Sequence, residues 1–207
     1  YNDCININPS HGTEMFIFDR NDLSLVSKSV IDPFYAFHFT NGYEEKDGTI
    51  HIEFAQDKFE EAWKFTRDFP LGEKGESVKA DVGTVLTYMK IDPKQGKVIK
   101  RGQVSGTLNA EFPTVADTQV GKKWQYSHFV TSSVRNAALE AGEYYRAIGR
   151  LDHKSDNLQI HDFGPNRYVN EPLLVSKKEN PEEGYILTLI FDSEKEASEL
   201  WIHESKN

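Results

Sequence analysis

Residues 37–45, Phe-His-Phe-Thr-Asn-Gly-Tyr-Glu-Glu, contain the histidine of this chain that is best placed to do chemistry. His38 ends an almost wholly apolar stretch and precedes an Asn-Gly pair, an aromatic residue and two acids. An imidazole in such a stretch is expected to be buried, and a buried imidazole needs a hydrogen-bond partner or a metal ion. The residue pattern leaves both interpretations open, and a hydrogen-bonded core histidine is the commoner case.

Other polar residues give weaker signals. Glu44 and Glu45 could form the carboxylate pair of a glycoside hydrolase. Adjacent residues of an extended chain point to opposite faces, however, so we expect solvated acids. His51 and Glu53 share one face of a strand, and amphipathic alternation explains them better than a metal pair does. The remaining candidates lack the spacing of metal ligands: His11, His128, His153 and His161. His153 is expected to be exposed in a turn.

The composition limits the class of protein. Of 207 residues, 38% are hydrophobic and 12% aromatic, which indicates a folded globular chain. The net charge of −9, without a basic cluster, argues against a nucleic-acid partner. A single cysteine, Cys4, favours a reducing compartment. No apolar run reaches membrane-spanning length and no signal peptide is apparent, so we expect a cytoplasmic protein.

Short strand-like runs recur about every ten residues, separated by turn signals, and predict an all-β sandwich, barrel or propeller. Residues 15–19 and 23–30 predict one hairpin. Residues 34–40 and 49–55 predict a second, joined by Asn41-Gly42 and closed by Asp47-Gly48. Residues 59–67 are the only predicted helix, and residues 69–78 a loop. The other predicted strands are 82–91, 97–104, 124–131, 144–151, 157–163, 172–178, 185–192 and 198–203.

Three motifs resemble the carotenoid oxygenase family in order along the chain. Residues 37–45 are similar to its His-x-x-Asn-Ala-Tyr/Trp-Glu segment, with Gly42 in place of alanine. Residues 108–113, Leu-Asn-Ala-Glu-Phe-Pro, resemble its Glu-Phe-Pro segment. Residues 168–175 resemble its Ser-Glu-Pro-x-Phe-Val segment, and the similarity continues through residues 182–188 and 198–200. The resemblance covers most of the chain and is weakest at residues 60–75 and 132–143.

The resemblance implies part of a seven-bladed β-propeller, with about three blades in residues 1–207 and a non-haem Fe(II) ion on the axis. It implies that His38 is one of four histidine ligands. It also implies that Glu111 accepts a hydrogen bond from the second ring nitrogen of His38. By the same resemblance, Glu171 would support a different ligand histidine that the chain does not contain. Such carboxylates fix the tautomer and orientation of a ligand imidazole.

The family's other three ligands would lie outside residues 1–207, so the chain is expected to be a central-to-C-terminal piece that lacks N-terminal blades and the extreme C-terminus. His203 is a poor candidate for the last ligand, because apolar residues usually stand at its position in the family. A piece with one ligand is expected to bind iron weakly and to be inactive alone.

The implied reaction is cleavage of a conjugated carbon–carbon double bond by dioxygen. The implied substrate is a lipophilic polyene, either a carotenoid or apocarotenoid, or a stilbene-like molecule. The family also includes an isomerase with the same ligands. Such substrates make peripheral contact with a membrane plausible. The alternative from another functional class is a catalytically silent β-propeller or sandwich that serves as a binding module.

Overall fold

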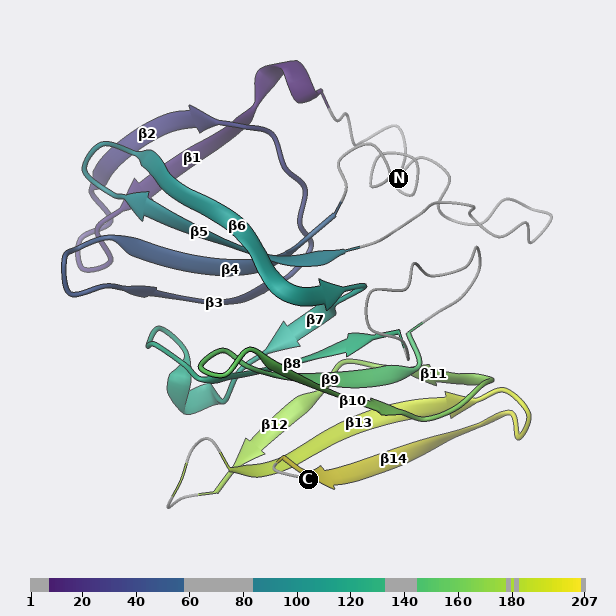
Figure 1. The fold of residues 1–207 in the computed structure, drawn as a ribbon. Helices are drawn as coiled ribbons and strands as arrows, with labels where there is room; N and C mark the ends of the chain where they lie inside the picture. Colours follow the sequence, from purple (N-terminus) through teal and green to yellow (C-terminus); the bar gives the residue numbers. More distant parts are fainter. Residues whose placement is uncertain (1–7, 58–83, 133–144, 178–179, 181–182, 206–207) are drawn as a thin grey trace.

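Strands make up almost all of the regular structure that the computed structural model describes, which covers residues 8–57, 84–132, 145–177, 180 and 183–205 (Figure 1). Two 3-10 turns, η1 (Pro9–His11) and η2 (Asp117–Gln119), are the only helical elements in these ranges. The strands are β1 (Thr13–Phe18), β2 (Leu25–Ile31), β3 (Phe39–Glu44), β4 (Ile50–Gln56), β5 (Val85–Asp92), β6 (Lys97–Leu108), β7 (Glu111–Thr114), β8 (Tyr126–Thr131), β9 (Ala147–Asp152), β10 (Asn157–Asp162), β11 (Arg167–Val169), β12 (Leu173–Ser176), β13 (Gly184–Asp192) and β14 (Ala197–Glu204).

The strands form four antiparallel sheets that follow one another along the chain. Sheet I is β1-β2, sheet II is β3-β4-β5-β6, sheet III is β7-β8-β9-β10, and sheet IV contains β11 to β14. In Figure 1 the sheets are stacked in chain order from sheet I at the top to sheet IV at the bottom. The all-β prediction is therefore confirmed, and each four-stranded sheet has the size of a propeller blade.

A separate hydrophobic core joins each pair of neighbouring sheets. Phe54, Met89 and Ile91 of sheet II pack against residues of sheet I. Sheets II and III share a second core, and sheets III and IV share a third. The members of the second core are Ala55, Leu86, Ala110, Phe129 and Leu151, and those of the third are Ala116, Ile148, Leu174 and Ile186. Alternate residues of the middle strands thus face different neighbours, which explains why these strands are apolar on both faces.

The second predicted hairpin exists, and its turn contains the predicted Asp47-Gly48 pair, whereas the prediction that Asn41-Gly42 joins the two strands is wrong. Asn41 and Gly42 lie inside β3, and the turn between β3 and β4 follows at residues 45–49. Gly48 adopts a left-handed φ of 84° there, and the Asp47 carboxylate accepts the Thr49 N–H. Asn-Gly predicted a turn from local chemistry alone. The Asn41 side chain instead bonds a neighbouring sheet, as described below.

The strand predictions in the second half of the chain are confirmed within a few residues. Two short strands, β7 and β11, were not predicted. Both lie where proline or asparagine interrupts the alternation of apolar residues that marks a strand. Residues 34–38, predicted as strand, form only an isolated bridge from Tyr35 to Asp57. The predicted helix at 59–67 and the loop at 69–78 lie outside the described residues.

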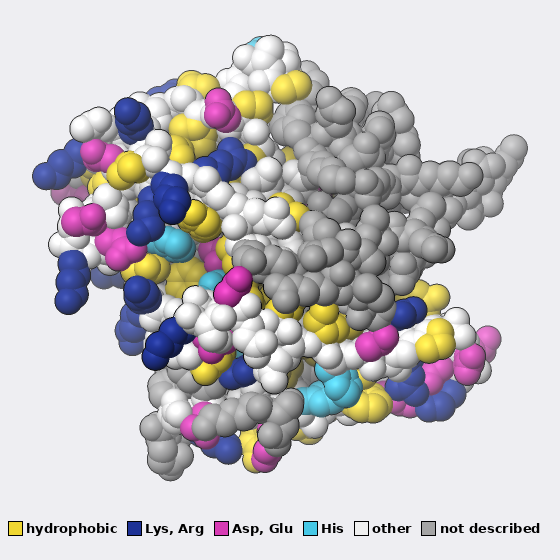
Figure 2. Space-filling view, in the orientation of Figure 1, with side chains coloured by type: hydrophobic (Ala, Val, Ile, Leu, Met, Phe, Trp, Pro, Cys, Tyr) yellow, Lys and Arg dark blue, Asp and Glu magenta, His cyan; other side chains and the backbone are white. Residues whose placement is uncertain are grey.

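Apolar side chains remain exposed on the outer faces of the first and last sheets. On β13, Ile186 and Ile190 are buried toward sheet III, whereas Leu189 and Phe191 point outward. Leu200 and Ile202 of β14 extend this outer face. Sheet I likewise exposes large apolar residues, namely Phe16, Phe18, Leu25 and Val30. Figure 2 shows hydrophobic side chains at the surface of both halves of the molecule. Contiguous exposed apolar surface of this kind marks an interaction face.

Gly149 of β9 lies opposite Phe129 of β8, and the Phe129 ring covers the glycine. A Cβ added at position 149 would overlap the ring, which is fully buried. We therefore expect Gly149→Ala to lower the free energy of unfolding by about 1–3 kcal/mol, the usual cost of overpacking a core. Denaturant unfolding monitored by circular dichroism measures this change.

The double variant Gly149→Ala/Phe129→Leu provides the control. Leucine is smaller than phenylalanine and should relieve the overlap, so the cost of Gly149→Ala should be smaller in the Phe129→Leu background. Equal costs in the two backgrounds would show that Phe129 does not restrict position 149.

Candidate metal centre

His38 and Glu111 are far apart in sequence and meet between sheets II and III. His38 Nδ1 lies 2.8 Å from Glu111 Oε2. His38 immediately precedes β3, and Glu111 is the first residue of β7. These edge strands of adjacent sheets contact each other and lie side by side in Figure 1. The structure therefore brings together the two residues that the sequence motifs single out.

The backbone of each partner is fixed locally. The carbonyl oxygen of His38 accepts a hydrogen bond from the Ala55 N–H of β4 at 2.9 Å. On β7, a register shift between Glu111 and Thr114 leaves one extra residue opposite β8, which is a β-bulge. Phe112, inside this bulge, has a φ of 48°, a conformation that costs about 1–3 kcal/mol for a residue with a side chain. Strain of this size is typical of positions that aim functional groups.

The bulge aims two groups at the imidazole. The Phe112 ring lies against His38 with ring centroids 4.4 Å apart, and the Phe112 N–H donates to Glu111 Oε2 at 3.0 Å. The Glu111 side chain is 9% exposed, and burial raises the pKa of its carboxyl group, an effect that the His38 and Phe112 hydrogen bonds partly oppose. Glu111 is thus a largely desolvated acceptor that the protein holds in one orientation.

This arrangement prepares His38 Nε2 to act as a ligand. A carboxylate at Nδ1 favours the tautomer that carries its proton there, and the lone pair is then on Nε2. The His38 side chain is 39% exposed, so the expectation that it is buried is wrong.

Asn41 anchors the same strand to sheet III. Its side-chain amide donates to the carbonyl oxygens of Gln119 and Lys122, and its oxygen accepts the Gly121 N–H at 3.0 Å. Gln119 ends η2, and Gly121 and Lys122 lie in the loop that follows it. The asparagine three residues after His38 therefore fixes where β3 sits relative to the sheet that carries Glu111.

The other predicted site residue, Glu171, does not join this centre. It is exposed, between β11 and β12, and no described contact links it to His38 or Glu111. Among the residues that the structure describes, no group of three or more His, Cys, Asp and Glu side chains is arranged to hold a metal ion. The fit to iron is therefore partial, because the described residues supply one oriented imidazole with its supporting carboxylate.

A second polar cluster between sheets II and III escaped the sequence analysis. His153 Nε2 lies 2.7 Å from Ser127 Oγ, and the Trp124 indole N–H donates to both atoms. His153 Nδ1 faces Glu53 Oε2 at 3.7 Å, too long for a hydrogen bond. His153 is therefore mostly buried rather than exposed in a turn as predicted. No sequence signal could join these positions, because Glu53 belongs to sheet II and the other three residues to sheet III or its connecting segments.

The order Ser127, His153, Glu53 resembles a hydrolase triad, but its burial excludes that role. Ser127 is fully buried and Glu53 is 1% exposed, so no substrate reaches the hydroxyl. Burial raises the pKa of Glu53 to about 8, only partly offset by Thr40 and Ser127, and lowers the pKa of His153 to about 4. Burial thus favours the neutral form of both groups, and the cluster joins two sheets.

Glu53 should make stability depend on pH. Its carboxyl pKa is higher in the folded chain than its ordinary value of 4.5, so between pH 4.5 and about 8 the folded state binds more protons than the unfolded state. The contribution of Glu53 to the free energy of unfolding is therefore present at low pH and lost as pH rises through this window. In the wild type, raising the pH through this window should lower the free energy of unfolding by about 2–5 kcal/mol, and Glu53→Gln should abolish this decrease.

Unfolding curves at pH 5 and pH 8 test this expectation. The titrations of His153 and His128 remain in the variant, so the difference between variant and wild type isolates Glu53. Glu44→Gln, at an exposed acid on β3, is the matched control and should follow the wild type. Parallel pH profiles for wild type and Glu53→Gln would contradict the raised pKa.

In the part of the chain that the structure describes, no helix has the length and hydrophobicity needed to cross a bilayer. The predictions of a cytoplasmic location, of peripheral membrane contact and of no nucleic-acid partner stay predictions.

Solved structures with the same fold are available for comparison. Cobalt-substituted Synechocystis ACO matches with a TM-score of 0.81 at 20% sequence identity, over 99% of this chain and 40% of that one. An ACO/RPE65 chimera matches with a TM-score of 0.83 at 21% identity over the same shares. A variant of Synechocystis apocarotenoid oxygenase (ACO) gives a TM-score of 0.83 at 20% identity. The chain thus spans about 40% of the length of these structures.

These neighbours confirm the predicted fold, part of a seven-bladed β-propeller with about three blades present. The family described as retinal pigment epithelial membrane protein (RPE65) matches residues 1–207 in full. The order of the three sequence motifs, the paired His38 and Glu111, and this match agree. The chain therefore belongs to the carotenoid oxygenase family.

Proposed function

We propose that the longer protein carrying this chain is a non-haem Fe(II) dioxygenase that cleaves a conjugated carbon–carbon double bond in a carotenoid, apocarotenoid or stilbene-like molecule. The observation that carries the proposal is the 2.8 Å contact between His38 Nδ1 and Glu111 Oε2, which prepares Nε2 for a metal ion. Imidazole nitrogen suits Fe(II), and a supporting carboxylate raises its basicity. Bound Fe(II) would supply oxygen activation beside the alkene.

The residues of this chain position and shield the reacting groups. Glu111 holds the Nδ1 proton of His38 and so keeps the ring in one tautomer and one orientation. Phe112 and Phe37 place aromatic surface next to the imidazole, with ring centroids 4.4 and 6.2 Å from it. Aromatic surface excludes water and suits a lipophilic polyene. In this proposal Glu171 supports a ligand histidine from outside residues 1–207.

The exposed apolar faces of sheets I and IV support the proposal that further blades complete the propeller. A blade buries both faces against its neighbours, and each end of the described stack leaves one apolar face open. The match to only 40% of the structural neighbours agrees with this. The remaining ligands, and the loops that choose the substrate and the bond, belong to those blades in this proposal.

Product analysis in the longer protein tests the function. The purified protein, loaded with Fe(II), is incubated with an apocarotenoid under ¹⁸O₂, and the products are identified by mass spectrometry. Two carbonyl products that carry ¹⁸O are expected from the wild type and none from His38→Gln. Saturable binding with the substrate recovered unchanged would instead support the silent binding module. Recovery of a geometric isomer would support an isomerase.

A further inference from the structure

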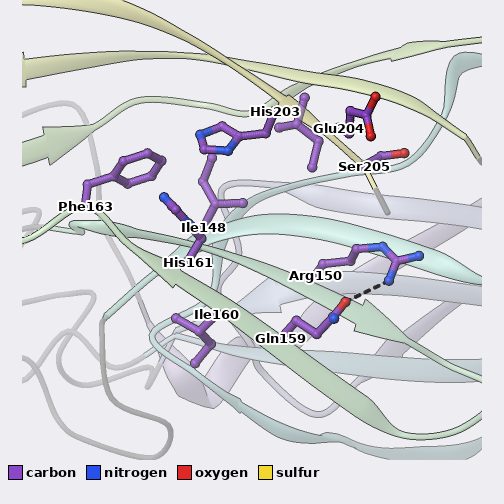
Figure 3. Close-up of a pocket in the computed structure, with 10 residues that line it drawn as sticks. Ile148, Arg150, Gln159, Ile160, His161, Phe163, His203, Glu204 and Ser205 are labelled. Atoms are coloured by element: carbon purple, nitrogen blue, oxygen red, sulfur yellow. Dashed lines mark hydrogen bonds between the residues drawn. The ribbon is translucent and has the colours of Figure 1, made fainter. Parts of the chain in front are cut away.

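A cavity of about 210 Å³ lies between sheets III and IV, and its lining includes neither His38 nor Glu111. Strands β9 and β10 line one side and β13 and β14 the other, so the cavity is formed by two neighbouring blades (Figure 3). Its walls combine apolar side chains with two histidines, and the lining residues include Ile148, Ile160, Phe163, Ile186, His161 and His203. Neither the sequence motifs nor the proposed dioxygenase chemistry uses these histidines.

His161 and His203 come from different blades and face each other. His161 of β10 is opposite Ile148 of β9, and His203 of β14 is opposite Ile186 of β13. Because Ile148 and Ile186 pack together in the core between the two sheets, the strand register brings the histidines together beside them. Their ring centroids are 4.7 Å apart with planes at 61°, and Figure 3 shows the two rings adjacent at the cavity.

Neighbouring aromatic rings restrict the pair. His203 stacks on Trp201 with planes 16° apart, and Phe163 packs edge-on against both histidines. Rings held in this way lose little further rotational freedom when a ligand binds. A ligand that joins the two rings therefore meets a largely preorganised site.

His203 carries an unused ligand atom. Its Nε2 is shielded from solvent and has no hydrogen-bond partner, whereas buried polar atoms normally have one. Burial, and then the nearby His161, lower the pKa of His203. The imidazole is therefore neutral near pH 7, the form that coordinates metal ions.

We propose that His161 and His203 form a binding site for a divalent late transition-metal ion, Zn²⁺ or Cu²⁺, that bridges two blades. With metal–nitrogen bonds of about 2.0–2.1 Å, two imidazoles on one tetrahedral ion have centroids about 5 Å apart, close to the separation observed. Imidazole selects these ions over Mg²⁺ and Ca²⁺, which prefer oxygen. Because the described residues contain no group of three donor side chains, water completes the coordination.

Metal titration of the tag-free 207-residue chain tests the site. Every sample carries His38→Gln, which removes the other oriented imidazole. Calorimetry with Zn²⁺ is expected to show one saturable site per chain that weakens at least about tenfold in His161→Gln or His203→Gln, because each change removes one of two bonds. Mg²⁺ should not bind there. The electron paramagnetic resonance spectrum of bound Cu²⁺ should show nitrogen coupling from two imidazoles in the parent chain and from one in each variant.

Two controls keep the test decisive. His11→Gln changes an exposed histidine in η1 and should leave Zn²⁺ affinity unchanged. His161 is exposed on an edge strand, so His161→Gln is expected to fold even if His203→Gln does not. Absence of a saturable Zn²⁺ site, or equal affinities in the parent chain and His161→Gln, would overturn the proposal and leave the pair as packing between blades. Neither outcome bears on the dioxygenase proposal, because His38 is replaced in every sample.

Discussion

Glu111→Gln is expected to lower both the iron affinity and the turnover of the longer protein by about 10–100-fold, the usual cost of removing a carboxylate that supports a ligand histidine. The amide at position 111 can accept a hydrogen bond, but it lacks the charge that raises the basicity of His38. Burial already raises the pKa of the Glu111 carboxyl group, so a neutral side chain of the same shape is no harder to bury. The variant should therefore remain folded.

Iron content after dialysis against a chelator, together with the rate of product formation, measures the effect. Glu44→Gln is the matched control, because it removes an exposed acid from β3, the strand that follows His38. The melting temperatures of both variants should stay near that of the wild type. Wild-type iron content and turnover in Glu111→Gln would show that the contact with His38 is only structural.

The 207-residue chain alone should retain iron only substoichiometrically after desalting and should cleave no substrate. Its described residues offer one imidazole oriented by a carboxylate, and a mononuclear iron site needs several ligands. The difference in iron content and turnover between the isolated chain and the longer protein should exceed the effect of any single substitution, because the isolated chain offers only one oriented ligand. Metal analysis and the ¹⁸O₂ product assay measure it.

Co-expression with the flanking segments of the longer protein provides the control. If the open apolar faces of sheets I and IV receive the further blades that we propose, the flanking segments should associate with the chain and restore iron binding. Restoration should fail when the chain carries His38→Gln. One tightly held iron per isolated chain would contradict the account, since the necessary ligands would then lie within residues 1–207.

The sequence predicted most strands because their turns are encoded locally. Residues 92–96 combine Asp, Pro and Gly, and the structure forms a turn there with the Asp92 carboxylate accepting the Lys94 N–H. Asn41-Gly42 has equally good local turn chemistry and was mispredicted. Its role is set by contacts with residues 119–122, about 80 positions away, and those contacts cannot be read from local pattern.

The residues of the candidate site were likewise predictable only in part. His38 and Glu111 could be paired in advance only because their motifs resemble those of a known family, since 73 positions separate them. Glu53, Ser127 and His153 form a comparable cluster without any such motif, and they were read singly as a strand residue, an unremarked serine and an exposed histidine. A cluster that spans two sheets depends on the stacking of the blades, and periodicity does not contain that information.

In the proposed metal centre, His38 binds iron through Nε2 while Glu111 holds Nδ1. The most direct test is a crystal structure of the longer protein with anomalous diffraction collected on both sides of the iron absorption edge. We expect an iron peak within bonding distance of His38 Nε2, with Glu111 Oε2 still hydrogen-bonded to Nδ1. An iron peak bound by other residues, with the His38 ring turned away from it, would contradict the account.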